Sequence, residues 1–233
     1  MDKFYKDYRK FAMDKHHMSG LVLDDYQRFN ERMAYQNPYV IEESQQNMTQ
    51  LDIFSRLMKD RIIFLGDEID DTVSNIISSQ LLFLSNQDEE KDISLYINSP
   101  GGVCQGGLQI LDTVSYIPNE ISTICMGTAA SMAAVILICG DKRYATYNSA
   151  IMIHTPSGGA QGKAADIIIS AERIKYIREK LYKIISANTG QPYDKVFELC
   201  RDDYWMSAQE ALEFGAIDHI LEPKKKKARI TNV

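Results

Sequence analysis

The 233-residue chain has few cysteines, and their spacing is not typical of a metal site. The four cysteines, Cys104, Cys125, Cys139 and Cys200, lie far apart, and no two form a C-x-x-C pair. This pattern fits neither a zinc site nor the disulfide framework of a small secreted protein. Most of them lie in apolar stretches, so we predict buried free thiols in a reducing compartment.

Positive charge and long apolar runs are also lacking. Acidic residues outnumber basic residues 32 to 26, and the formal net charge is −6. No basic excess is available to hold the chain on nucleic acid or an anionic membrane. The longest apolar stretch, Ala129 to Cys139, is shorter than the roughly 18 residues of a membrane span. The N-terminal Met1 to Asp7 has no apolar segment typical of a secretory signal. The prediction is a soluble, cytoplasmic protein.

The central part of the chain alternates between strand and helix patterns. Apolar residues make up 45% of the sequence, which is enough for a full core. The predicted strands are Ile62–Leu65, Asp92–Asn98, Ile121–Met126, Ala150–Ile153 and Ala216–Leu221. Short helices are predicted over residues 73–84 and 106–115, and a third short helix is predicted to begin at the capping box Ser207–Glu210. Such alternation predicts an α/β fold with mostly parallel strands.

The segments outside this pattern have different compositions. We expect residues 1–37 to form an extension, the polar stretch 42–50 to be an irregular loop, and the basic run 224–229 to be a solvated tail. Ala164 to Asn188 shows apolar residues at helical spacing, which predicts a rod of about 37 Å. This helix is longer than the chain's own core needs, so part of its apolar stripe is expected to contact another subunit.

The turn Asn98-Ser99-Pro100-Gly101-Gly102-Val103 joins a strand to a helix. Its two glycines permit unusual backbone angles and let a ligand approach, so free N–H groups there could bind an oxyanion. A plain connecting turn is the alternative. A phosphate loop is disfavoured because no Gly-Lys-Ser/Thr follows.

Ser131 is the only serine among small residues, in Gly127-Thr128-Ala129-Ala130-Ser131-Met132. It lies between a predicted strand and an apolar helix, where small neighbours leave room for a substrate carbonyl and a helix N-terminus favours negative charge. Ser131 is therefore a candidate nucleophile. The alternative is that its side chain only caps the helix.

A serine nucleophile needs a base, and the chain has four histidines. His16 and His17 lie in the extension, and His219 lies in the last predicted strand, where we expect a structural role. His154 follows the strand Ala150–Ile153, at a sheet end where open α/β folds place their sites. His154 is therefore the candidate base.

The base in turn needs a carboxylate to orient it. Asp202 and Asp203 precede an apolar run that holds the only tryptophan, whereas Asp112, Asp141 and Asp166 lie elsewhere in the chain. Spacing alone does not choose among these five candidates.

With these residues assembled, the sequence resembles the proteolytic subunits of the Clp protease, a serine peptidase family. The resemblance runs from about Pro38 to Leu221. Its markers are Asp52–Leu57, Leu95–Gly102, Thr123–Gly127, Ala129–Met132, Met152–His154, Gly158–Gly162 and Met206–Ala208.

The resemblance implies the roles of individual residues. It matches Ser131 to the nucleophile, His154 to the base and Asp203 to the acid, and the backbone N–H groups of Gly102 and Met132 to the oxyanion donors. The choice of Asp203 rests on this resemblance. The implied reaction is hydrolysis of unfolded polypeptides to short peptides.

The resemblance also implies an architecture and partners. Residues 38–221 would form the peptidase domain, in the spiral α/β fold shared with crotonases, between the extension or propeptide 1–37 and the basic tail 222–233. Residues 158–188 would be a protruding handle, and 42–50 an axial entrance loop. Two seven-membered rings would stack into a barrel, a tetradecamer, fed by a hexameric ATP-driven AAA+ unfoldase. ATP would be used by that partner, and this chain would need no cofactor and no metal.

Further positions match contact sites of the family. Tyr96, Tyr116 and Tyr144 match the pocket that receives the docking loops of the unfoldase. Arg201, Asp202 and Gln161 match ring-to-ring contacts. These six assignments come from the resemblance alone.

Two pairs of oppositely charged residues occur in reversed order relative to the family pattern, and one usual Glu is replaced. The chain has Arg201-Asp202 where Asp-Arg is usual, Glu172-Arg173 where Arg-Glu is usual, and Ile168 where Glu is usual. We hypothesise that these changes alter ring pairing, in favour of self-pairing or of pairing with a sister subunit. Mixing with an ordinary family member tests this by native mass spectrometry, because freely scrambled rings would contradict it.

Differences beside the base bear on cleavage preference. Thr155 and Ser157 replace the usual Gln and Leu, and Ala133 replaces a Gly. Two other classes of protein share some of these features. Crotonase-type acyl-CoA enzymes share glycine-rich turns but lack a Ser-His-Asp set, and a non-catalytic ring subunit is disfavoured by the intact set.

Overall fold

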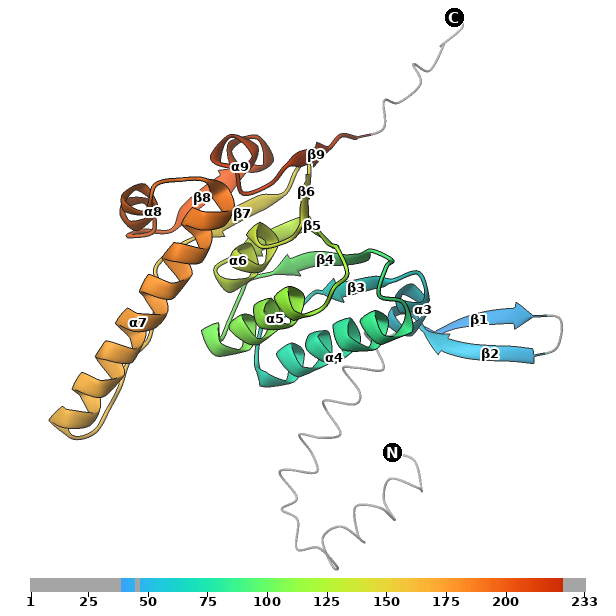
Figure 1. Cartoon of the computed structure of the whole chain (residues 1–233), viewed down its shortest axis with the longest axis horizontal. Coiled ribbons are helices and arrows are strands. Elements are labelled where there is room, and N and C mark those ends of the chain that lie inside the picture. The colour runs from blue at the N-terminus through green and yellow to red at the C-terminus, as the bar shows by residue number, and fades with distance from the viewer. Residues whose placement is uncertain (1–38, 45–46, 224–233) are drawn as a thin grey trace, which may run out of the picture. The chain divides into compact units, whose positions relative to one another are not determined.

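The computed structural model describes residues 39–44 and 47–223 (Figure 1). The predictions for the extension 1–37 and for the basic run 224–229 lie outside the described residues. The chain divides into two compact units, one up to Leu57 and one from Met58 onward. Each unit is described separately.

The first unit contains a β-hairpin where the sequence predicted an irregular loop. Strands β1 (Tyr39–Ser44) and β2 (Asn47–Asp52) pair antiparallel, and Ser44 lies opposite Asn47. The prediction of a loop over residues 42–50 is therefore wrong for 42–44 and 47–50. Polar composition suggested a loop, but strand pairing depends on backbone hydrogen bonds, and β-branched residues in both arms favour extended backbone.

Helix α3 (Ile53–Lys59) begins directly after the hairpin because Asp52 caps it. The Asp52 carboxylate accepts hydrogen bonds of 3.0 Å from the backbone N–H groups of Phe54 and Ser55. A further hydrogen bond from the Ser55 hydroxyl lowers the pKa of Asp52. The capping carboxylate therefore stays charged near neutral pH.

The second unit is built on a seven-stranded sheet (Figure 1). Its strands are β3 (Ile62–Leu65), β4 (Ile93–Ser99), β5 (Ile121–Ala130), β6 (Lys142–Thr146), β7 (Ala150–Ile153), β8 (Tyr204–Ser207) and β9 (His219–Leu221). The main path runs β3-β4-β5-β6-β9, and β7 pairs with both β5 and β8. Every pair is parallel except β7–β8. The predicted α/β class and mostly parallel pairing are confirmed.

The helices of this unit are α4 (Asp71–Gln87), α5 (Cys104–Tyr116), α6 (Met132–Ile138), α7 (Ala164–Thr189), α8 (Tyr193–Leu199) and α9 (Ala208–Phe214). The α6 segment is apolar all round, and all seven of its residues are buried. Figure 1 shows α4 and α5 side by side along the sheet. The predicted capping box at Ser207 and the left-handed Gly215 bound α9 as expected. The last strand begins at His219, later than the predicted Ala216.

The two faces of the sheet differ in burial. One in-register row, Leu65, Ile97, Cys125 and Ala145, has no exposed surface and belongs to the core. The alternate row crosses five strands and consists of Phe64, Tyr96, Ile124, Tyr144 and His219. All of these except Ile124 are partly or fully exposed. The second row therefore forms an aromatic surface on the face opposite the core row.

Helix α7 projects away from the sheet (Figure 1). Only its C-terminal half contributes buried residues, namely Leu181, Tyr182 and Ile185. In its first half, Ile168 and Ile169 are 63% and 68% exposed. The chain's own core therefore leaves much of the long apolar stripe uncovered, as the sequence predicted.

All four cysteines are free thiols, as predicted, but only Cys125 and Cys200 are buried, while Cys104 and Cys139 are half-buried. Burial raises the pKa of Cys125 to about 11 and that of Cys200 to about 12. No helix among the described residues combines the length and apolar character needed to cross a membrane.

Candidate active site

Ser131 lies at the end of β5, beyond a bend in that strand. The first half of β5 pairs with β6 and the second half with β7, and Gly127 lies between the two halves with a φ of 100°. The Asn98 side chain supports this bend by accepting a hydrogen bond of 3.1 Å from the Thr128 N–H. Asn98 was not singled out in the sequence, and only its place before the glycine turn hinted at a role.

The backbone of Ser131 is in a conformation that non-glycine residues rarely adopt. Its φ is 55° and its ψ is −124°, while its N–H donates to the Met152 carbonyl at 2.8 Å. Its carbonyl accepts from Ala134 and Val135 and so begins α6, but its side chain makes no capping hydrogen bond. The capping alternative is therefore wrong, and the strained backbone leaves the hydroxyl available to other groups.

That hydroxyl faces His154. The distance from Ser131 Oγ to His154 Nε2 is 2.8 Å. His154 is the first residue after β7, and the imidazole is 24% exposed. The strand end thus places a base within hydrogen-bonding reach of the serine.

The other ring nitrogen of His154 faces Asp203. The distance from His154 Nδ1 to Asp203 Oδ1 is 3.1 Å. Strands β7 and β8 pair antiparallel, with Ile153 opposite Tyr204. The next step of the same register brings residue 154 opposite residue 203. Pairing of two strands therefore selects Asp203 from the five carboxylates that the sequence left open.

The other carboxylates lie elsewhere. Asp141 accepts a hydrogen bond of 2.7 Å from the Ile121 N–H, Asp166 lies in the first turn of α7, and Asp112 lies on α5. Asp202 is exposed beside Asp203. None of these four carboxylates is hydrogen-bonded to His154 within the described part of the chain.

The glycine turn packs directly against the serine. A Cβ added to Gly101 would lie 2.7 Å from Ser131 Cβ and 2.9 Å from the Met132 nitrogen. The Gly101 carbonyl accepts a hydrogen bond from the Ile69 N–H, and the Val103 N–H donates a hydrogen bond to the Ile69 carbonyl. Both bonds lie on one side of the turn, so the N–H of Gly102 points to the opposite side.

Met132 supplies the second candidate donor. It is the first residue of α6, where the helix leaves backbone N–H groups without intrahelical partners. The two predicted donor residues thus belong to segments that touch at Ser131. A plain connecting turn does not account for this contact.

A small apolar pocket of about 20 Å³ adjoins the serine and the histidine. Cys104, Val135 and Leu181 contribute to its wall. Burial raises the pKa of the Cys104 thiol, so this neighbour is not an activated thiolate nucleophile.

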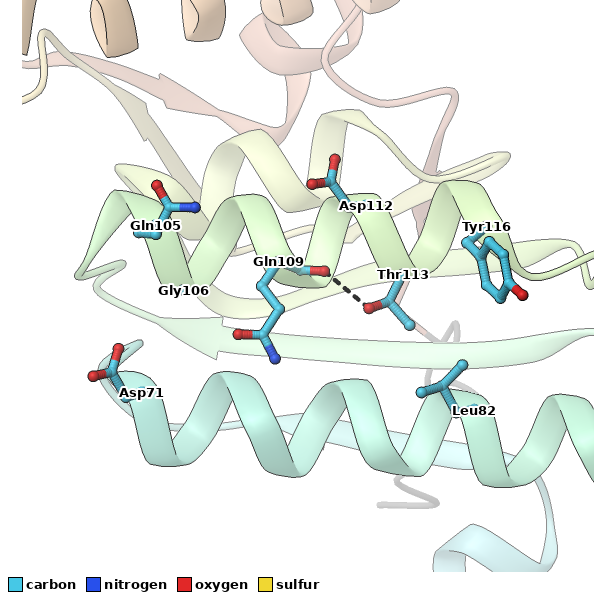
Figure 2. A pocket seen from close by; sticks show the side chains of 8 residues that line it. All are labelled: Asp71, Leu82, Gln105, Gly106, Gln109, Asp112, Thr113 and Tyr116. Atoms are coloured by element: carbon cyan, nitrogen blue, oxygen red, sulfur yellow. Dashed lines mark hydrogen bonds between the residues drawn. The ribbon is translucent and has the colours of Figure 1, made fainter. Parts of the chain in front are cut away.

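A larger hollow lies apart from these residues, between α4 and α5. Its volume is about 620 Å³, and its lining includes Asp71, Leu82, Gln109, Asp112 and Tyr116 (Figure 2). No member of the Ser-His-Asp set lines it. Ser131 and His154 line the smaller pocket instead.

The three tyrosines predicted to dock an unfoldase do not converge within one chain. Tyr96 and Tyr144 belong to the aromatic row of the sheet, where Tyr144 stacks on His219 at 5.6 Å between ring centroids. Tyr116 ends α5 and is 81% exposed beside the hollow in Figure 2. A single pocket containing all three would need more than one copy of the chain.

The residues predicted at ring contacts are all on the surface. Gln161, Arg201 and Asp202 are exposed, and Arg201 pairs with Glu198 at 3.2 Å within the same chain. In the predicted handle, Arg173 donates to Gln105 of α5 at 3.2 Å. These contacts lie within one chain and do not test the assignments to ring contacts, which stay predictions.

Comparison with known proteins identifies relatives over nearly the whole chain. The Clp protease family model matches residues 44–224. A protein of Bacteroides fragilis (strain YCH46) is 51% identical over 220 residues, which cover 94% of this chain and 99% of the relative. A protein of Porphyromonas gingivalis (strain ATCC BAA-308 / W83) is 48% identical over 222 residues, with the same coverage. Both relatives are named ATP-dependent Clp protease proteolytic subunit.

Proposed function

This chain belongs to the Clp protease family, and we propose that Ser131, His154 and Asp203 are the catalytic residues of its serine endopeptidase activity. The observation that carries the proposal is the 2.8 Å contact between Ser131 Oγ and His154 Nε2. The 3.1 Å contact between His154 Nδ1 and Asp203 supports it. The three side chains provide a nucleophile, a base and an orienting carboxylate, connected in that order by two hydrogen bonds.

The proposed reaction has two halves. Ser131 Oγ attacks the peptide carbonyl while His154 Nε2 takes its proton, and the same nitrogen then protonates the leaving amine. Water, activated by His154, hydrolyses the acyl-serine. Asp203 holds the Nδ1 proton in place and stabilises the imidazolium throughout, without accepting that proton.

We assign the oxyanion site to the backbone N–H groups of Gly102 and Met132. The contact of the glycine turn with Ser131 supports this assignment because both donors flank the serine. Backbone donors are fixed before the reaction, so they stabilise the developing negative charge without rearrangement. The apolar wall of the adjoining pocket supports cleavage next to an apolar substrate side chain.

We propose that the chain assembles head to tail with its own copies into two stacked seven-membered rings, in the spiral fold of the family. Two uncovered surfaces support this assembly. Leu82, Phe83 and Tyr116 are 46%, 49% and 81% exposed on the helical layer, and the aromatic row lies on the opposite sheet face. Unlike surfaces that meet between copies generate a closed ring when the rotation closes.

The docking pocket and the handle fit the same scheme. A pocket between neighbouring copies would combine Tyr96 and Tyr144 of one chain with Tyr116 of the next. The exposed isoleucines of α7 support a contact between rings through residues 158–188. Residues 42–50 would line the axial entrance, and Gln161, Arg201 and Asp202 would lie at the ring contact.

The proposed partner is a hexameric AAA+ unfoldase that feeds unfolded polypeptide into the barrel in the cytoplasm. The relatives' name, which includes the word ATP-dependent, supports an ATP-driven partner. In this scheme ATP is consumed by the unfoldase, and this chain uses no cofactor or metal.

The test is labelling with a fluorophosphonate serine probe alongside cleavage of a fluorogenic peptide. We expect both signals in the wild-type protein and their loss in Ser131→Ala. Ser122→Ala, a serine change on the same strand, serves as the matched control and should keep both. An assembled wild-type protein that neither labels nor cleaves would instead support a non-catalytic ring subunit.

A further inference from the structure

We propose that Ser99 is a positioning residue that holds the glycine turn of the oxyanion site against the nucleophile. Ser99 is the last residue of β4 and is 1% exposed. Its hydroxyl donates a hydrogen bond to the Asp67 carbonyl at 2.6 Å and accepts one from the Gly101 N–H at 3.1 Å. Ser99 therefore acts through the backbone and not on the substrate. The inference rests on the proposed function, because it concerns how the Gly102 N–H comes to face the substrate.

The orientation of the Gly102 N–H is set by the peptide unit between Gly101 and Gly102. The carbonyl of this unit accepts a hydrogen bond of 2.8 Å from the Ile69 N–H. A trans peptide is planar, and its N–H points away from its carbonyl, which here means away from Ile69. The contact with Ile69 therefore decides where the proposed oxyanion donor points.

The segment that carries Ile69 needs a tie to the sheet. Strand β3 ends at Leu65 and α4 begins at Asp71, and residues 66–70 belong to no strand or helix. An isolated bridge joins Ile69 to Gly102 of the turn. Because the segment and the turn bond each other, they can shift as a pair unless both are also bonded to a fixed strand.

Ser99 supplies that tie for both partners. Its backbone pairs with Ala129 of β5, close to the end of the strand that leads to the nucleophile. Its hydroxyl bonds the Asp67 carbonyl on the side of the segment and the Gly101 N–H on the side of the turn. One side chain therefore joins the turn, the segment that orients the turn, and the sheet.

Burial makes this hydroxyl difficult to replace. Ser99 and Gly101 are both buried. Removing the hydroxyl leaves the Gly101 N–H without its partner, and a buried unpaired N–H costs more free energy than one hydrogen bond contributes. We therefore expect the turn to rearrange toward another partner when the hydroxyl is lost. Such a rearrangement moves the Gly102 N–H away from the oxyanion position.

The neighbour of Ser99 supports the other half of the site. The Asn98 side chain accepts the Thr128 N–H and supports the bend of β5 before Ser131. Asn98 is exposed and Ser99 is buried, because successive side chains of a strand point to opposite faces. The end of β4 thus provides one support for the nucleophile and one for the oxyanion turn.

The experiment compares Ser99→Ala and Ser99→Cys with wild type in the assembled protein. Cysteine nearly keeps the size of the side chain but forms only weak hydrogen bonds, so the pair of variants separates hydrogen bonding from packing. We expect kcat on a fluorogenic peptide to fall roughly ten- to 100-fold in both, up to the cost of losing an oxyanion donor outright. KM and oligomer size should stay unchanged.

Inhibition by a peptide boronate reports on the oxyanion site itself. The adduct with Ser131 is tetrahedral and places an oxygen where the oxyanion forms, so it resembles the transition state. Its inhibition constant should therefore rise by the same factor as kcat falls. The pH profile of kcat/KM should keep its wild-type shape, because His154 and Asp203 are not altered.

Ser149→Ala is the matched control. Ser149 is 4% exposed, and its hydroxyl bonds the Thr146 hydroxyl and the Cys125 carbonyl, at 2.7 and 3.0 Å, instead of the turn. Loss of this buried hydroxyl should lower the melting temperature about as much as Ser99→Ala does. It should leave kcat and the boronate inhibition constant at their wild-type values.

Four results would overturn the inference. They are a wild-type kcat in Ser99→Ala, a lower kcat without a matching rise in the boronate inhibition constant, an equal loss of kcat in Ser149→Ala, and a loss that tracks disassembly. The proposed function fails separately, if the wild type does not react with the fluorophosphonate probe or if Ser131→Ala still cleaves.

Discussion

Replacing Gly101 by alanine should disable the active site while leaving the fold intact. Gly101 has a φ of 90°, and an added Cβ would lie 2.5 Å from the Ala130 carbonyl oxygen, 2.7 Å from Ser131 Cβ and 2.9 Å from the Met132 nitrogen. An ordinary contact is about 3.5 Å, so these atoms must separate by up to roughly 1 Å. The last two atoms belong to the serine and to a proposed oxyanion donor, and the first belongs to the residue before the serine.

The expected loss in kcat/KM is about 100-fold or more. A displacement of about 1 Å is enough to cost roughly 100-fold in rate, and loss of an oxyanion donor costs a similar factor. The left-handed backbone adds strain of about 1–3 kcal/mol, which should lower the melting temperature without unfolding the protein. The assay is peptide hydrolysis and serine labelling on protein whose assembly has been checked by native mass spectrometry.

Two other glycines separate the causes of the loss. Gly190 also has a positive φ, of 72°, but an added Cβ would meet nothing within 4 Å. Gly190→Ala should therefore lower stability and keep activity. Gly159→Ala, at an open position without a positive φ, should change neither. A Gly101→Ala protein with wild-type kcat/KM would refute the placement of the glycine turn against the serine.

Three further predictions concern the Asp203 carboxylate, the Arg143–Asp218 ion pair and the buried thiols. Asp203→Asn should lower kcat about 10⁴-fold at unchanged assembly, because the histidine tautomer is no longer fixed; a loss under tenfold would contradict the assignment. Hydrogen bonds from Arg143 lower the pKa of Asp218, so this pair stabilises the fold above about pH 4 and its contribution disappears as pH falls through the lowered pKa. Asp218→Asn should remove about 1 kcal/mol at pH 7, a small value since the partly exposed pair is screened, and less at pH 2 in urea titrations; an equal loss at both pH values would argue against it. The buried thiols of Cys125 and Cys200, with pKa values of about 11 and 12, should react with a thiol reagent at pH 8 only after unfolding, and fast reaction in the native protein would contradict their burial.

Sequence periodicity predicted the regular elements well. The apolar spacing between Val73 and Leu84 lies within α4, and the alternation in Ile93–Ser99 is that of β4. The elements it missed, β1, β2, α3, β6, β8 and α8, are only four to seven residues long. Over such lengths an apolar period cannot be distinguished from chance, and tertiary contacts decide the structure.

The candidate active-site residues could also be predicted only in part from the sequence. Ser131 could be singled out because small residues surround it between a predicted strand and helix, and His154 because the chain has only four histidines and this one follows a predicted strand. Asp203 could not be distinguished from Asp202 by residue chemistry, because neighbours on an extended chain differ only in the side they face. That choice depends on the register of β7 with β8, which is a long-range contact.

The antiparallel pairing of β7 and β8 also has a consequence for biosynthesis. The nucleophile and the base occur by residue 154, but the carboxylate that orients the base comes 49 residues later. A chain still emerging from the ribosome therefore carries Ser131 and His154 without Asp203 until β8 has been made and has paired. On the proposed assignment, peptide hydrolysis needs the C-terminal part of the sheet, so we expect a growing chain to be inactive as a protease until β8 has paired.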